Sequence, residues 1–342
     1  MTLTQLRYLV AIADSGFNIT QAAERVHATQ PGLSKQLKQL EDELGFQLFL
    51  RKGRSLEGVA PAGVKVIEHA RRILAEAANI RSYAANERGE HRGRLLLATT
   101  HTQARYVLPP VIAELKRRYP QVSVDLFASG DAEVLDKLDE ADFALISSAG
   151  GQPSSGGVAI PLYRWRRVLL VPASHPLAQL PGPPSLAELS RHPLISYESS
   201  KLPESSLQRA FAAVGAEPQI AMTARDANLI KTYVRAGLGA GLLAEMAVHT
   251  REDDDLRVIE APAELPECIT WAVVPRGRVL REYALALLQG LAPQLDPRDL
   301  RRVLEGNQEA EWPAAPRWSV PTPTAYALRT TSRGRRSEKG SE

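Results

Sequence analysis

The stretch NITQAAERVHATQPGLSKQLKQLEDELG, residues 18–45, contains two short helical patterns separated by a tight turn. In its second half, leucines recur at intervals of three and four residues, which places them on one face of a helix. Pro31 suits the first turn of that helix because its missing N–H needs no partner there. Gly45 follows the last leucine and can end the helix. The stretch therefore predicts a helix-turn-helix.

The face of the second helix that lies opposite the leucines is polar and basic. Glutamine, serine and lysine side chains can hydrogen-bond to base edges, and the major groove of DNA admits one helix. From this segment alone, an ordinary solvated face of a surface helix stays open as the alternative. The residues that we expect to contact DNA are Thr29, Gln30, Pro31, Ser34, Lys35 and Lys38.

Residues 47–56, QLFLRKGRSL, predict a two-stranded wing beside this motif. They form a short apolar run, a basic tip with a glycine, and a return strand. A run of charge is usually a solvated surface, but this one adjoins a helix-turn-helix, so Arg51 and Arg54 are expected beside the DNA backbone or in the minor groove. Residues 1–59 are thus predicted to be a winged helix-turn-helix DNA-binding domain.

Residues 60–89 predict a single long linker helix with one apolar seam. Such a seam must be covered, either by a domain or by a second copy of the helix. The sequence alone leaves both possibilities open. The seam consists of Val64, Ile67, Ala70, Ile73, Leu74, Ala77, Ile80 and Ala84.

Buried strands alternate with helices over residues 93–300, which predicts an α/β fold with parallel sheets. Two similar units follow one another, and the last strand and helix return to the first unit. We expect two subdomains that enclose a cleft, as in periplasmic ligand-binding proteins. Subdomain I would comprise about 93–161 and 266–300, and subdomain II about 162–265.

Residues 306–342 contain many prolines, serines, threonines and arginines and few large apolar groups. Burial of so little apolar surface would not offset the entropy of ordering the chain, so this composition predicts a disordered tail.

Length and composition agree with a multidomain protein. A chain of 342 residues suits two or three domains, and a net charge of only +3 means that any basic patch is local. The single cysteine, Cys268, excludes an internal disulfide and a cysteine-rich zinc site, and it suits a reducing compartment. Neither a membrane-spanning run nor a signal-peptide pattern is found. We expect a cytoplasmic protein without membrane association.

Residues 99–103, TTHTQ, follow the first predicted strand of the α/β region and precede a helix. Ligands bind at this edge of doubly wound sheets, and backbone N–H groups at a helix start attract anions. Hydroxyl and amide groups add uncharged donors, which suit a small anion that binds reversibly. Capping of the helix would explain one threonine but not four polar residues. The candidates for the site are Thr100, Thr102 and Gln103.

An enzyme is the competing class. His101 lies among threonines, but no Ser/His/Asp spacing, metal cluster or P-loop accompanies it. Residues 237–241, GLGAG, follow a helix and open a strand, the reverse of the order in a dinucleotide-binding motif. We therefore expect neither a catalytic residue nor a metal site.

The N-terminal motifs together resemble the LysR-type transcriptional regulators. One departure is Ala60, where the family usually has threonine. The resemblance implies binding to promoter sites on double-stranded DNA, pairing of the linker helices in a homodimer or homotetramer, and contact with RNA polymerase. The residues that carry it are Leu6-Arg7-Tyr8, Ala22-Ala23, Thr29 to Ser34, Leu40-Glu41, Leu44-Gly45, Leu48-Phe49, Arg51 and Pro61-Ala62-Gly63.

Within that family, residues 98–109, 223–226 and 230–235 resemble the CysB subfamily, which controls cysteine biosynthesis and, in a paralogue, sulfonate use. The likeness extends to about residue 298. It implies an effector cleft for sulfate, O-acetylserine or N-acetylserine, and no cofactor. The loop 197–206 departs from the subfamily, since Leu202 falls about where a ligand-contacting threonine is expected, so a different small acid stays open. The cleft residues implied are Thr100, Thr102, Gln103, Ser147 and Thr223.

Overall fold

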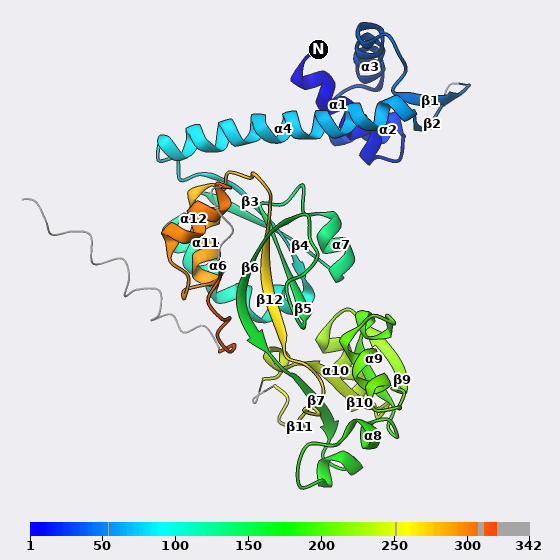
Figure 1. Cartoon of the computed structure of the whole chain (residues 1–342), viewed down its shortest axis with the longest axis vertical. Coiled ribbons are helices and arrows are strands. Elements are labelled where there is room, and N and C mark those ends of the chain that lie inside the picture. Colours follow the sequence, from blue (N-terminus) through cyan, green and yellow to red (C-terminus); the bar gives the residue numbers. More distant parts are fainter. Residues whose placement is uncertain (54, 250–251, 307–310, 320–342) are drawn as a thin grey trace, which may run out of the picture. The chain divides into compact units, whose positions relative to one another are not determined.

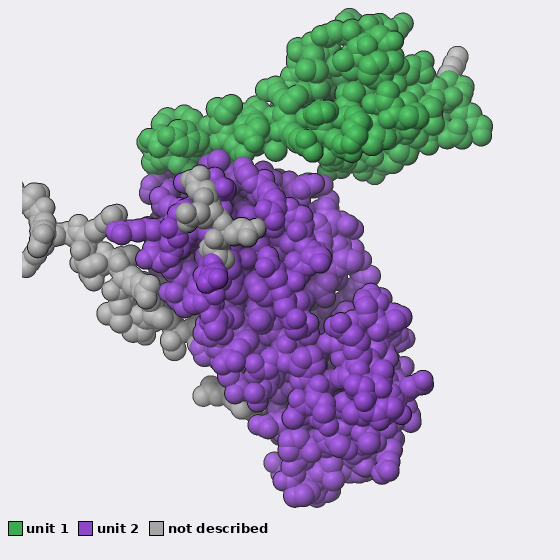
Figure 2. All heavy atoms as spheres, viewed as in Figure 1, with its two compact units in different colours: residues 1–89 green, residues 90–342 purple. Residues whose placement is uncertain are grey.

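The computed structural model describes residues 1–53, 55–249, 252–306 and 311–319. The chain forms two compact units, residues 1–89 and 90–342 (Figures 1 and 2). Each unit has its own hydrophobic core and is described by itself.

The first unit is a helical domain with a small hairpin. The leucine face of α3 supplies much of its core, because Leu33 and Leu40 are fully buried with Leu9, Ile12 and Phe49. Its elements are α1 (Leu3–Asp14), α2 (Ile19–Arg25), α3 (Gln30–Leu44), β1 (Phe49–Lys52), β2 (Ser55–Val59) and α4 (Pro61–Glu87).

The start and end of α3 follow from single residues. The Thr29 hydroxyl accepts a hydrogen bond from the backbone N–H of Gly32 at 3.3 Å, which caps the helix. Pro31 lies in the first turn, as the sequence predicts. Gly45 has a φ of 80°, a left-handed conformation that ends the helix at little cost. The antiparallel hairpin of β1 and β2 follows and forms the wing.

The apolar seam of α4 divides into two parts. Ile67 and Ala70 are buried in the core of the first unit, where α4 packs on α1. Further along the helix, Ile73 is 40% exposed, Ile80 69% and Tyr83 61%. Ile67 and Ala70 are therefore covered by the chain's own domain, whereas Val64, at the start of the seam, is 46% exposed. The second part presents large apolar side chains to solvent, which is typical of an interaction surface.

We predict that Ile80→Glu, alone and with Ile73→Glu, weakens self-association of the full chain. Burial of an isoleucine contributes roughly 1.5–3 kcal/mol, so the dissociation constant should rise by about tenfold or more. Light scattering across micromolar concentrations measures it, with Arg81→Glu on an exposed neighbouring position of the same helix as the control. An unchanged oligomer in the double variant would contradict a role for this part of α4.

The second unit contains two five-stranded sheets. In the first, the strand order is β4-β3-β5-β12-β6, with β3, β4 and β5 parallel and β12 antiparallel to β5 and β6. The elements of this subdomain are β3 (Gly93–Thr100), α5 (His101–Tyr106), α6 (Leu108–Arg118), β4 (Val122–Ser129), α7 (Asp131–Asp136), β5 (Phe143–Ala149), β6 (Gly157–Trp165), β12 (Cys268–Pro275), α11 (Glu282–Leu291) and α12 (Pro297–Leu304).

The second sheet has the order β11-β7-β10-β8-β9. Its subdomain comprises β7 (Arg167–Pro172), η1 (Pro176–Gln179), α8 (Leu186–Leu189), β8 (Leu194–Tyr197), η2 (Glu198–Lys201), α9 (Ser206–Ala213), β9 (Ile220–Ala224), α10 (Ala227–Arg235), β10 (Ala240–Ala244), η3 (Glu245–Ala247) and β11 (Leu256–Glu260).

The chain passes from the first sheet to the second between β6 and β7, and it returns between β11 and β12. The first passage follows Trp165, so the predicted boundary near residue 162 lies too early, within a strand of the first sheet. The predicted fold class is confirmed: an N-terminal winged helix-turn-helix, a long helix and an α/β domain of two subdomains.

The prediction of a disordered tail over 306–342 is wrong for residues 311–319. Arg164 of β6 donates its N–H to the carbonyl of Pro316 at 2.8 Å and accepts the N–H of Trp318 at 2.7 Å. The Trp312 indole donates to the carbonyl of Ala159, also on β6, at 3.2 Å. The segment thus pairs with an edge strand and adds two tryptophans to its packing. The rest of the predicted tail beyond residue 306 lies outside the described residues.

Candidate functional site

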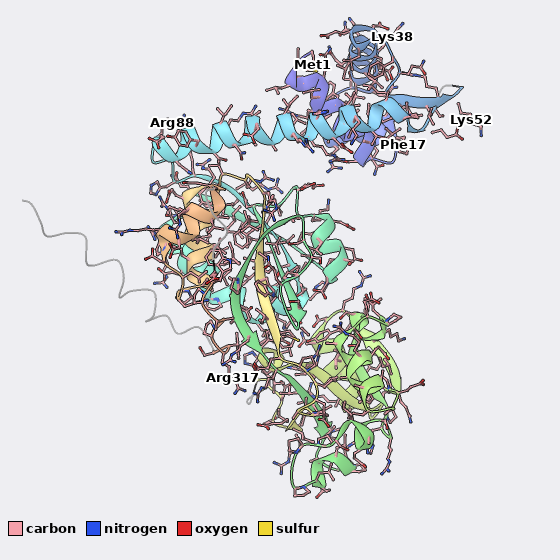
Figure 3. The ribbon with its side chains drawn as sticks, viewed as in Figure 1. Met1, Phe17, Lys38, Lys52, Arg88 and Arg317 are labelled. Atoms are coloured by element: carbon pink, nitrogen blue, oxygen red, sulfur yellow. The ribbon has the colours of Figure 1, made fainter. Side chains whose placement is uncertain are left out.

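The predicted DNA-contacting residues of α3 share one surface. Thr29, Gln30, Pro31, Lys35 and Lys38 are exposed, and Ser34 is half-buried (Figure 3 labels Lys38). The Gln30 amide donates to the Ser34 hydroxyl at 3.1 Å. This bond uses one of the two N–H groups of the amide and leaves its carbonyl oxygen open, so Gln30 keeps both a donor and an acceptor.

The wing is joined to α3 by a buried carboxylate. Glu41 of α3 is 7% exposed, and its two oxygens accept the backbone N–H of Leu48 at 2.8 Å and the Arg51 guanidinium at 2.7 Å. Arg51, which the sequence assigns to DNA, therefore also holds the wing against α3. Arg54 lies outside the described residues.

We predict that Glu41→Ala destabilises the first unit by about 1–3 kcal/mol, because it leaves a buried N–H without its partner. Thermal or urea unfolding of the full chain, followed by circular dichroism, measures the change. Glu43→Ala is the matched control, because Glu43 lies on the same helix, is half exposed and pairs with the N-terminal amine. Equal stability of the two variants would show that the carboxylate does not anchor the wing.

A cavity of about 370 Å³ lies in the second unit, and residues of both subdomains line it. Four of the predicted effector residues are among them: Thr100, Thr102, Gln103 and Ser147. Thr223 is not in the lining, although the next two residues of the chain are. Predicted residues from two separate segments thus come together at one place, and a third segment contributes through Ala224 and Arg225, the neighbours of Thr223.

Gln103 lies in the lining and is held by internal hydrogen bonds. The side chain is 1% exposed, its amide donates to the Thr270 hydroxyl at 3.2 Å, and its carbonyl oxygen accepts the hydroxyl of Tyr163. A further contact of the amide goes to the sulfur of Met246. These partners occupy the amide group. Gln103 is therefore fixed within the lining by its internal partners, and its contact with an anion stays a prediction.

Thr270 determines how Ser147 is oriented. The fully buried Thr270 hydroxyl accepts the Gln103 amide and, at 3.0 Å, the Trp165 indole N–H. These bonds use both of its lone pairs, so its own hydrogen is donated to the Ser147 oxygen, 3.1 Å away. The hydrogen of Ser147 is then left to donate to a ligand in the cavity.

Tyr197 supplies a second donor from the opposite subdomain. Its phenol oxygen accepts the Thr102 hydroxyl at 3.2 Å and the backbone N–H of Ala244 at 3.4 Å. Burial raises the pKa of Tyr197 above its ordinary value, so the phenol stays protonated at neutral pH. Its own hydrogen therefore remains to be donated. The contact with Thr102 also joins the two subdomains directly.

Charged residues in the lining divide into a rim and an interior. At the exposed rim, Arg225 forms ion pairs with Glu198 at 2.8 Å and with Glu133 of α7 at 3.3 Å. Glu204 and Arg209 are also exposed. The charged lining residues that are not exposed are Arg167 and Asp131.

Arg167 is a half-buried cation in the lining of the cavity. It donates to the Ser206 hydroxyl at 2.6 Å and to the carbonyl of Pro266 at 3.2 Å. Together with the free hydrogens of Ser147 and Tyr197, it makes the cavity rich in donors. Such a site can hold a small anion.

Sequence reasoning missed Arg167, Asp131 and Tyr197. Tyr197 ends β8 and Asp131 opens the helix after β4, so both lie at carboxyl ends of strands, where ligands of α/β folds bind, whereas Arg167 opens β7. Many residues lie at the end of a strand or the start of a helix, however, and no short sequence motif distinguishes these three.

The described residues contain no group of three or more His, Cys, Asp or Glu side chains placed to hold a metal ion. Cys268 lines the cavity, and burial raises the pKa of its thiol, so the thiol is protonated at neutral pH. None of the helices in the described ranges is both long and apolar enough to span a membrane.

A helix-turn-helix domain and a ligand-sized cavity in a separate α/β unit define a class of protein: a regulator in which one chain carries both a DNA-binding part and a part that binds a small molecule. Residues 3–63 match the bacterial regulatory helix-turn-helix protein, lysR family, and residues 88–296 match the LysR substrate binding domain. The chain belongs to the LysR family. This is a family of transcriptional regulators, not of enzymes, and its members bind DNA and form oligomers.

The resemblance to CysB is confirmed along most of the chain. HTH-type transcriptional regulator CysB of Haemophilus influenzae is 39% identical over 297 residues, which cover 86% of this chain and 91% of that protein. HTH-type transcriptional regulator cbl of Escherichia coli is 35% identical over 313 residues, covering 90% and 98%. The crystal structure of the cofactor-binding domain of the Cbl regulator matches with a TM-score of 0.57 and 34% identity, over 63% of this chain and 95% of that chain.

Proposed function

We propose that this protein is a LysR-type activator of sulfur assimilation and cysteine biosynthesis genes that responds to a small effector with an acidic group, namely sulfate, O-acetylserine or N-acetylserine. The observation that carries the proposal is the donor-rich cavity of a chain related to CysB and cbl. The alternative is a regulator of another pathway with a different small acid as its effector.

The donors of the cavity support an anion. Ser147 and Tyr197 each have a hydrogen left after their internal hydrogen bonds, and Arg167 adds one positive charge. A volume of about 370 Å³ is at the low end of the size of small-molecule sites. These features favour a compact acid over a large aromatic or nucleotide ligand.

The partners follow from the same proposal. Promoter DNA would contact the exposed surface of α3 and the wing, and a second copy would contact the exposed seam of α4, in a homodimer or homotetramer. An activator of this kind acts in the cytoplasm and also contacts RNA polymerase. No cofactor is required, because binding of the effector is the only chemistry.

The cavity is tested by a pair of matched variants. Thr102→Ala should weaken binding of the effector several-fold, because loss of one hydrogen bond costs about 0.5–1.5 kcal/mol and the Thr102 hydroxyl also orients Tyr197. Thr223→Ala should leave affinity unchanged, since Thr223 is outside the lining. Titration calorimetry of the full chain with sulfate, O-acetylserine and N-acetylserine measures both. Equal affinities in the two variants would place the effector elsewhere.

The DNA surface is tested by Gln30→Ala. Loss of a base contact should weaken binding to the specific promoter site by roughly 1–3 kcal/mol and spare binding to random DNA. Fluorescence anisotropy with both DNAs at one salt concentration measures this. Gln121→Ala, at an exposed glutamine of the second unit, is the control. An equal loss on specific and random DNA would refute base recognition by Gln30.

A further inference from the structure

The segment at residues 311–319 pairs with the outer edge of β6, where both backbone groups of Arg164 take part. It lies beyond residues 88–296, the part of the chain that matches the LysR substrate binding domain. The segment is therefore outside that match. It is anchored on the strand that leads into the first passage between the two subdomains.

The two passages between the subdomains are held together by glutamates. Arg166, between β6 and β7, donates its backbone N–H to a carboxylate oxygen of Glu245 at 3.0 Å, and its carbonyl accepts the backbone N–H of Glu245 at 3.0 Å. Glu245 follows β10 in the second subdomain. On the return passage, Glu267 pairs with Arg166 at 2.7 Å and with Arg164 at 3.4 Å. Because the chain crosses here, rotation of one subdomain against the other changes backbone angles at these residues.

Arg317 connects the segment to these glutamates. Its guanidinium lies 3.4 Å from the second carboxylate oxygen of Glu245 (Figure 3 labels Arg317). The pKa of the Glu267 carboxyl is lowered chiefly by Arg166, and the charges of Arg164 and Arg317 add to this effect. The carboxylate of Glu245 thus binds the crossing residue with one oxygen and the segment with the other.

An exposed ion pair contributes little by itself, and the side chains of Arg317 and Glu245 are 56% and 18% exposed. The backbone of Arg317, however, is fixed on both sides, since the residues before and after it bond to Arg164. Less conformational entropy is then lost when the pair forms. The segment therefore contacts the first subdomain through β6 and the second through Glu245.

We propose that residues 311–319 are a brace that fixes the angle between the two subdomains, through the Arg317 guanidinium on the carboxylate that holds Arg166. While the brace is bound, the Glu245 carboxylate keeps both of its partners and the first passage stays closed. Release of the brace lets the angle vary. A ligand that needs this angle finds a larger fraction of competent molecules when the brace is bound. The inference does not depend on which effector occupies the cavity.

Hydrogen exchange of the full chain, resolved to single amides by mass spectrometry, tests the brace. In Arg317→Glu, the introduced carboxylate repels Glu245 and Glu267. The amides of Arg166 and Glu245 should then exchange about tenfold faster or more, because both of their hydrogen bonds join these two residues and not the segment. The amides in the centre of β5 should exchange as in the wild type.

Two further chains complete the comparison. A chain that ends at residue 310 lacks the brace, and it should show the same faster exchange at Arg166 and Glu245. Arg302→Glu is the matched control, because Arg302 is also an exposed arginine but pairs with Asp299 of its own helix. It should leave both amides unchanged.

The amides of Arg166 and Glu245 decide the outcome. Wild-type exchange at both, in Arg317→Glu and in the shortened chain, would overturn the brace and leave the segment as a cover for the edge of β6. Faster exchange to an equal degree in β5 would also overturn it, since the effect would then not be confined to the passage. Faster exchange at the two amides with β5 unchanged would support it, whether or not the Trp318 amide also loses protection.

Discussion

The arrangement of polar side chains in the cavity depends on the hydrogen bonds of the Thr270 hydroxyl. Thr270 lies on β12, directly opposite Ser147 of β5 and Tyr163 of β6, so the strand register brings these side chains together. Its oxygen accepts two N–H groups and its hydrogen goes to Ser147. A one-residue slip of β12 would turn Thr270 to the other face of the sheet and disperse the cluster. Thr270 does not line the cavity, yet its hydrogen bonds determine which hydroxyl groups of the lining can donate to a ligand.

The first unit uses a buried polar group in the same way. Glu41 joins the recognition helix to the wing through Leu48 and Arg51, so the two parts of the predicted DNA surface are held by one carboxylate. In both units, a buried acceptor whose partners are all internal fixes the positions of residues that are expected to meet a ligand. The groups that face the ligand retain donor hydrogens or charges that are not engaged by other groups of the protein.

Local patterns in the sequence predicted much of the fold. The leucine spacing, Pro31 and Gly45 indicated α3, and alternating strands and helices indicated the α/β class. The sequence could not predict the roles of Gln103 and Arg167, because these depend on Thr270, Tyr163 and Ser206, which are distant in the chain. The proline-rich composition of residues 311–319 led to a wrong prediction of disorder. This segment is ordered because its backbone pairs with the edge strand β6 and its two tryptophans pack on the core.

The most direct test of this account is the effector affinity of Thr270→Val, measured by titration calorimetry of the full chain with whichever of sulfate, O-acetylserine and N-acetylserine the wild type binds most tightly. Valine keeps the shape of threonine and removes the hydroxyl. Because Thr270 is outside the lining, any effect must act through Ser147, Gln103 and Trp165. The account predicts a loss of about tenfold or more in a chain that still binds random DNA. Wild-type affinity in this variant would contradict it.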